Sequence, residues 1–165
     1  MSSPKELKDL LAIATNRYIE EAIFIKPFDM TIESLGEDSA SMKFAAHKAL
    51  TASIRNPNLQ GGAIATVLDV VGSLAVFASV IGRMKGKSAL EKVEALEKGM
   101  IEGKGAWRMS TIDLRIDYLR PGRGEYYLAS ARILRTGKTV AVTRMELHND
   151  QDKLIAVGTG TYIVG

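Results

Sequence analysis

A single carboxylate stands inside the most apolar stretch of the chain. Asp69 is the only charged residue of residues 63–81. On a helix, Ser73 lies one turn further along the same face. A buried, unpaired carboxylate is costly and tends to have a raised pKa, which suits a general base or a nucleophile. The structural alternative is that Asp69 caps a neighbouring element or pairs with an arginine such as Arg115.

Two glycines precede this stretch, in the order Gln60, Gly61 and Gly62. If a helix begins at Gly61, its first backbone N–H groups lie at the positive end of the helix dipole, with no side chain covering them. Such N–H groups can hold the oxyanion that develops when a carbonyl is attacked. A plain glycine turn is the alternative, and the carboxylate downstream favours the reactive interpretation.

The spacing of these two features constrains how they act together. Gly61 and Asp69 are eight residues apart, which is about 12 Å along a helix. One carbonyl group can hardly touch both. Two helices related by a two-fold axis can instead bring the N-terminus of one subunit to the carboxylate of the other. We therefore predict an obligate dimer with two composite sites.

Two glycine-containing turns carry cations and present free backbone amides, a combination that suits phosphate groups. The candidate binding residues in these turns are Arg120, Arg123, Arg135, Gly137 and Lys138. The alternative for both turns is that their basic side chains are simply exposed to solvent, as in most basic turns.

The composition narrows the classes of protein. The 165 residues include 22 Lys and Arg against 19 Asp and Glu, a surplus too small and too dispersed for a nucleic-acid interface. With no cysteine and only His47 and His148, we expect no metal site. The N-terminus is polar, and small residues interrupt the apolar stretch around Asp69, which favours a buried helix over a membrane span. We expect a cytoplasmic protein.

Hydrophobic periodicity divides the chain into elements of a single domain, residues 1–165. Strands are predicted at residues 28–33, 40–46, 111–119, 125–135, 139–148 and 154–164, with hairpin turns between the first two and between successive members of the last four. Helices are predicted within residues 1–24, 61–82 and 84–105, with capping boxes at residues 3–6 and 88–91. Residues 53–58 are expected to form a loop. The order predicts an α+β fold with a mainly antiparallel sheet.

Four segments, taken in order, resemble the hotdog-fold acyl-CoA thioesterases of the phenylacetate-pathway (PaaI-like) type, in the 4-hydroxybenzoyl-CoA thioesterase superfamily. They are residues 60–65 with Asp69, Gly72 and Ser73, residues 110–121, residues 135–139, and residues 156–160. The resemblance extends from about residue 25 to residue 164. It implies a long central helix wrapped by an antiparallel sheet, two subunits that share a continuous sheet, and often a dimer of such dimers.

The resemblance also implies roles for particular residues. The Gly61 amide would bind the thioester oxygen, and Asp69 would be the nucleophile or general base. Ser73 and Thr111 would orient water or the carboxylate, and Asn56 or Asn58 would position the water. Gln60 stands where these enzymes usually have a histidine. It can donate a hydrogen bond but cannot titrate near neutrality.

We therefore expect hydrolysis of an acyl-CoA thioester by a homo-oligomer that needs no metal or organic cofactor. An alternative is a non-catalytic acyl-CoA or lipid-binding protein that has lost turnover through Gln60. An acyl dehydratase would want a histidine near the central helix, for which His47 and His148 are poorly placed. The helical insertion, residues 84–105, is either a lid over the acyl group or a surface decoration.

Overall fold

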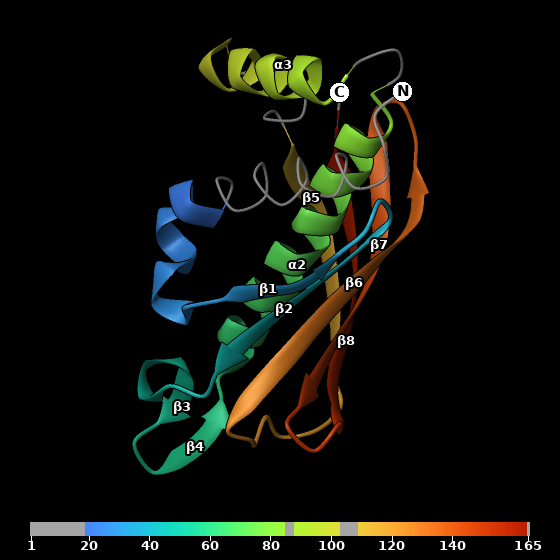
Figure 1. Cartoon of the computed structure of the whole chain (residues 1–165). Coiled ribbons are helices and arrows are strands. Elements are labelled where there is room, and N and C mark those ends of the chain that lie inside the picture. Colours follow the sequence, from blue (N-terminus) through green and yellow to red (C-terminus); the bar gives the residue numbers. More distant parts are fainter. Residues whose placement is uncertain (1–18, 85–87, 103–108, 165) are drawn as a thin grey trace.

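The computed structural model describes residues 19–84, 88–102 and 109–164 (Figure 1). The elements in chain order are the 3₁₀ helix η1 (Ile23–Phe28), strands β1 (Thr31–Leu35) and β2 (Ser39–Ala45), the 3₁₀ helix η2 (Lys48–Leu50), strands β3 (Thr51–Ser53) and β4 (Asn56–Leu59), helices α2 (Gly61–Gly82) and α3 (Ala89–Glu102), and strands β5 (Ser110–Tyr118), β6 (Tyr126–Thr136), β7 (Val140–Asn149) and β8 (Leu154–Ile163).

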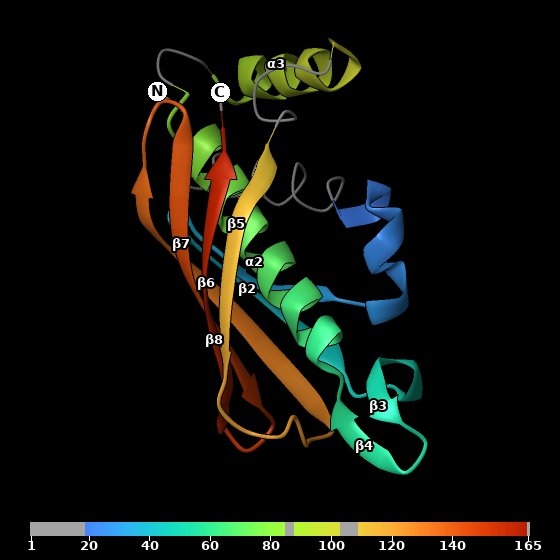
Figure 2. The ribbon, with the colours of Figure 1, turned by 180° about the vertical axis from the view of Figure 1, so that it is seen from behind.

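Six of the strands form one antiparallel sheet in the order β1-β2-β6-β7-β8-β5. Helix α2 runs along one face of this sheet, and β5 lies at one edge (Figures 1 and 2). The predicted hairpin of the first two strands is present as β1 and β2, and the predicted turns after β6 and β7 join neighbouring strands. The arrangement confirms the predicted α+β class, with a long central helix on an antiparallel sheet.

The predicted hairpin turn between residues 119 and 125 is wrong. Strand β5 pairs with β8, whereas β6 pairs with β2 and β7. The connection therefore runs from the edge of the sheet to its interior. Its Pro and Gly residues do form a bend, with the Arg123 N–H donating to the Pro121 carbonyl oxygen at 2.9 Å. Turn composition marks a change of direction, but it does not say which strands pair.

Two further predictions differ from the structure near the N-terminal strands. The first strand begins at Thr31 rather than residue 28, because the segment around Pro27 forms η1 and ends in a left-handed residue, Asp29, with φ of 47°. Part of the expected loop at residues 53–58 belongs to a short hairpin, β3 and β4, whose seven residues show too little alternation to be recognised.

The helices outside the centre are described in part. Residues 19–21 are helical, and the earlier part of the predicted opening helix lies outside the described residues. Within the predicted insertion, α3 begins with the expected capping box: the Ser88 N–H donates to Glu91 Oε2 at 2.6 Å, and the Glu91 N–H donates to Ser88 Oγ at 3.3 Å. Residues 85–87 and 103–105 of that prediction also lie outside the described residues.

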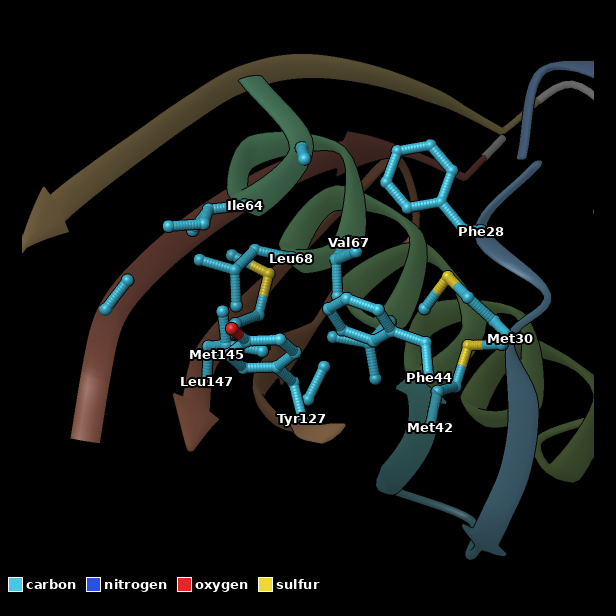
Figure 3. Packing of buried hydrophobic residues seen from close by; sticks show 14 of the residues in the cluster. Phe28, Met30, Met42, Phe44, Ile64, Val67, Leu68, Tyr127, Met145 and Leu147 are labelled. Atoms are coloured by element: carbon cyan, nitrogen blue, oxygen red, sulfur yellow. The ribbon is translucent and has the colours of Figure 1, made fainter. Parts of the chain in front are cut away.

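Helix α2 supplies the centre of the hydrophobic core. Its residues Val67, Leu68 and Val71 have no exposed surface, and Figure 3 shows Val67 and Leu68 among side chains from the sheet and from η1. By length and composition alone this helix could cross a membrane, yet 72% of its most apolar window is buried against the rest of the protein. The prediction of a buried helix is confirmed.

Gly72 marks a close approach between α2 and the sheet. A Cβ atom at this position would overlap the Tyr162 hydroxyl oxygen and the Met145 sulfur. Both of those side chains are fully buried. We expect Gly72→Ala to lower the free energy of unfolding by about 2 kcal/mol, because overpacking a core forces neighbouring atoms to shift. Urea denaturation measures this change.

Gly82→Ala is the matched control, since a Cβ atom there would meet the side chain of Glu37 at an ordinary 3.6 Å. This change is expected to alter stability by less than about 1 kcal/mol. Equal unfolding free energies for the two variants would contradict the close approach at Gly72.

Candidate functional site

The N-terminus of α2 presents two free backbone donors. Gln60 caps the helix, and its side-chain Oε1 accepts a hydrogen bond from the Ala63 N–H at 3.1 Å. Within the described part of the chain, the N–H groups of Gly61 and Gly62 make no hydrogen bond. The Gly61 carbonyl oxygen is bound by the Tyr118 hydroxyl at 3.0 Å. This end of the helix is therefore fixed in place, with its first amides available to an anion.

Asp69 lies two turns further along α2. The sequence suggested a buried carboxylate, whereas in the structure Asp69 is half-buried. Thr111 Oγ1 on β5 donates to Asp69 Oδ1 at 2.9 Å. No described cation pairs with this carboxylate: Arg115, the alternative partner, instead contacts Asp117 at 3.3 Å. Among the described residues, the carboxylate is thus oriented by one hydroxyl and has no cation as an ion-pair partner.

A β-bulge at Ile112 turns Thr111 toward the helix. In the pairing of β5 with β8, Thr111 lies opposite Tyr162 and Asp113 lies opposite Thr161, so that Ile112 has no partner. Side chains alternate in a regular strand, which would place Thr111 and Leu114 on opposite faces. With the extra residue, Thr111 reaches Asp69 while Leu114 packs against the core. Bulges of this kind commonly redirect a side chain beside an active site.

A cavity of about 270 Å³ opens beside the carboxylate. Helix α2 lines one wall with Thr66, Asp69, Val70 and Ser73. The Ser73 hydroxyl donates to the Val70 carbonyl oxygen at 2.9 Å. The sequence-predicted residues Asp69, Ser73 and Thr111 are therefore brought together around one cavity.

Sequence reasoning missed the other walls of this cavity. An apolar part of the lining comes from η1 and its N-cap residue, with Ala22, Phe24 and Ile25. Tyr162 and Met109 also contribute. The Tyr162 hydroxyl donates to the Asp69 carbonyl oxygen at 3.2 Å. These residues are apolar or aromatic side chains scattered along the chain. No local pattern marks them, because only the fold brings them together.

The predicted water-positioning and phosphate-binding residues divide into two groups. Asn56 begins β4, and its Oδ1 accepts from the Asn58 N–H at 3.2 Å. Asn58 Oδ1 in turn accepts from Arg123 Nε at 2.8 Å, and Arg120 Nη1 donates to the Leu154 carbonyl oxygen at 2.8 Å. The connection that carries both arginines meets β4 next to Gln60, since the Leu59 N–H donates to the Gly122 carbonyl oxygen at 2.8 Å. This group lies at the Gly61 end of the helix.

A buried tyrosine, Tyr127, also contacts the connection between β5 and β6. The Tyr127 hydroxyl donates to the Gly122 carbonyl oxygen at 2.9 Å. Burial, and then the negative charge of Asp150, raise the pKa of Tyr127 above its usual value of 10.0. The hydroxyl therefore remains protonated and able to donate at neutral pH.

Arg135, Gly137 and Lys138 lie at the other end of α2. Their turn is anchored by the Arg83 side chain, whose Nη1 donates to the Thr136 carbonyl oxygen at 3.0 Å. The 22 residues of α2 span about 33 Å at 1.5 Å per residue. One chain therefore does not bring these three residues to Gly61. Helix α3 also lies at this far end of α2 (Figure 1), and none of its described residues lines the cavity beside Asp69.

Comparison with known proteins gives a consistent result. The family model of the thioesterase superfamily matches residues 56–156. The medium/long-chain acyl-CoA thioesterase YigI of Escherichia coli (strain K12) is 34% identical to this chain, over the full length of both. A crystal structure from Shewanella oneidensis, of a protein related to the thioesterase superfamily, is 35% identical, covers 94% of this chain and 97% of its own, and has a TM-score of 0.78.

The Escherichia coli PaaI protein of the phenylacetic acid degradation operon is similar in fold alone, with 18% identity, 96% of each chain covered and a TM-score of 0.73. These likenesses agree with the resemblance expected from the ordered motifs. Since the family model matches more than half of the chain and a full-length relative is 34% identical, the chain belongs to the thioesterase superfamily.

Proposed function

We propose that this protein hydrolyses acyl-CoA thioesters to the free acid and CoA, at sites that two subunits share. The observation that carries the proposal is the pairing on one helix of a free Gly61 amide with a half-buried Asp69 that is held by Thr111. An oxyanion donor and a carboxylate are the groups that acyl transfer requires. The full-length relative YigI is named as a thioesterase that acts on medium and long-chain acyl-CoA.

The proposed reaction begins when the thioester carbonyl oxygen accepts a hydrogen bond from the Gly61 N–H. Negative charge then develops on this oxygen at the positive end of α2. Asp69 of the partner subunit either attacks the carbonyl carbon or removes a proton from a water that attacks it. The carbon–sulfur bond breaks, and CoA leaves as a thiolate that takes up a proton. If Asp69 is the nucleophile, water then hydrolyses the mixed anhydride. These steps use the chain's own groups and water, without a metal or an organic cofactor.

The contacts along β5 support the shared site. This strand is at the edge of the sheet, so no described strand pairs with its outer backbone groups. Near one end Thr111 contacts Asp69, and at the other Tyr118 contacts Gly61. If two β5 strands pair antiparallel around a two-fold axis between residues 114 and 115, Thr111 of each lies opposite Tyr118 of the other. Asp69 of one subunit then faces Gly61 of its partner.

Two cations at the Gly61 end are proposed to meet the phosphates of CoA. Arg120 and Arg123 are exposed and lie on the connection that contacts β4. Guanidinium groups pair well with phosphate. Arg135, Gly137 and Lys138 stay a prediction for phosphate binding, because no contact in the described structure links them to the Gly61 end. The cytoplasmic location also stays a prediction.

The direct test of the proposal is release of CoA thiol from short, medium, long and aromatic acyl-CoAs by the purified protein. We expect turnover of at least one class, with the free acid as the second product. If no acyl-CoA is hydrolysed but acyl-CoA raises the melting temperature, the protein is a binding protein, and the proposal is wrong.

The residue type at position 60 is expected to affect how kcat/KM depends on pH. Its amide caps the helix without titrating, so it adds no ionisation to the reaction. A histidine at this position can accept from the Ala63 N–H only while it is neutral. We therefore expect Gln60→His to introduce a step in kcat/KM near pH 6.5, with a loss of about 1 kcal/mol of stability as the pH falls through it. Gln60→Asn, which keeps an amide, serves as control. A pH profile common to both variants would contradict the capping role.

A further inference from the structure

A second cavity shares one lining residue with the first. It measures about 390 Å³ and is lined by residues of η1 and of the segments on both sides of it. Ile25 lines both this cavity and the one beside Asp69. Its side chain is only 6% exposed. Among the described residues that line either cavity, the buried Ile25 is the only one that lines both.

The second cavity has an apolar interior and a charged surround. Ile19 and Met30 pack with the main hydrophobic core, and Figure 3 shows Met30 at the side of that core where the chain leaves η1. Glu20, Lys26 and Asp29 provide the charged groups. The interior thus suits a hydrocarbon, while the rim remains hydrated.

The cavity volumes indicate what Ile25 controls. The first cavity, about 270 Å³, is just below the roughly 300–1,000 Å³ of ordinary small-molecule sites. The two cavities together fall well inside that range. Phe24 and Ile25 line the same cavity as Asp69 and Val70, so an acyl group bound beside Asp69 has these apolar side chains within the cavity. Ile25 is also a lining residue of the second cavity.

We propose that Ile25 sets the length of the acyl chain that the enzyme accepts, by closing the passage from the reaction cavity to the second cavity. This inference rests on the proposed thioester hydrolysis. An acyl group that ends at Ile25 fills the first cavity. A longer chain enters the second cavity only when the Ile25 side chain moves aside, and it then contacts Ile19 and Met30. Removal of the Ile25 side chain beyond Cβ joins the two spaces.

The experiment compares kcat/KM for acyl-CoAs of increasing chain length in the wild-type protein and in Ile25→Ala. Each methylene newly buried is worth about a fourfold gain, so burial of one to two more methylenes raises the hexadecanoyl-CoA to octanoyl-CoA ratio of kcat/KM about tenfold. Ile23→Ala is the matched control: this isoleucine lies in the same 3₁₀ helix, is 79% exposed and lines neither cavity. Its chain-length profile should equal that of the wild type.

Two further variants keep the inference testable if Ile25→Ala folds poorly. Ile25→Val is expected to shift the profile in the same direction by a smaller factor, and Ile25→Phe to shift it toward shorter chains. An unchanged profile in the folded Ile25 variants, with hydrolysis retained, would overturn the role of Ile25 and leave the proposed function standing. Absence of hydrolysis by the wild type would overturn both.

Discussion

Replacing Asp69 by Asn is expected to lower kcat for acyl-CoA hydrolysis about 1,000-fold, the magnitude typical of losing a general base. Asn has the shape of Asp, and its side-chain oxygen can still accept the hydrogen bond that Thr111 donates at 2.9 Å. The fold and the cavity should therefore persist. What is lost is the negative charge that attacks the thioester or deprotonates water. Free thiol release gives kcat, and urea denaturation shows that the variant is folded.

Asp117→Asn is the matched control for this change. Asp117 lies on β5 and is far from Asp69 in the sequence. Its side chain forms an exposed ion pair with Arg115 at 3.3 Å. Such pairs contribute at most about 1 kcal/mol. Activity of this variant should remain within about twofold of the wild type. If Asp69→Asn retained wild-type kcat, the carboxylate would have no part in the chemistry.

Replacing Gly61 by Pro is expected to lower kcat about 100- to 1,000-fold, the effect of removing one oxyanion donor. Proline has no N–H group, yet it is well tolerated at the first position of a helix. The residue before it must be extended, and Gln60 already is, with φ of −71° and ψ of 141°. The substitution therefore removes the donor and keeps the helix. The loss should fall mainly on kcat rather than KM, because the interaction strengthens as charge develops in the transition state.

Gly61→Ala separates the missing amide from the added side chain. Alanine retains the N–H group, and its Cβ atom would lie 3.6 Å from the Tyr118 ring, an ordinary contact. We expect activity within about threefold of the wild type. Equal losses in the Ala and Pro variants would show that bulk, rather than the lost hydrogen bond, is responsible.

The sequence predicts the fold where side-chain alternation is regular and long. The last four strands are predicted to within one residue at each end, because their alternation continues for at least nine residues. Pairing is harder to predict. The composition of the connection after β5 is that of a hairpin turn, yet β5 pairs with β8 instead. Non-local packing decides that arrangement, and a local pattern does not contain it.

Some residues of the candidate site can likewise be recognised from the sequence, whereas other features of the site depend on the fold. Asp69 and Gly61 are recognisable because a charge and a pair of glycines are unusual in an apolar helix. The bulge at Ile112 that directs Thr111 to Asp69 leaves no mark in the sequence, since it depends on register with β8. The contact of Tyr118 with Gly61 and the cavity wall at Ile25 depend equally on the fold.

The most direct test of the shared site is complementation between two inactive chains. Asp69→Asn and Gly61→Pro chains are unfolded together, refolded as a mixture, and assayed for CoA release. A mixed dimer has one site with both defects and one site with neither, so random pairing predicts recovery of about one-quarter of wild-type activity. If the mixture is no more active than the two variants refolded separately, the amide and the carboxylate do not act across a subunit interface, and the proposed site is wrong.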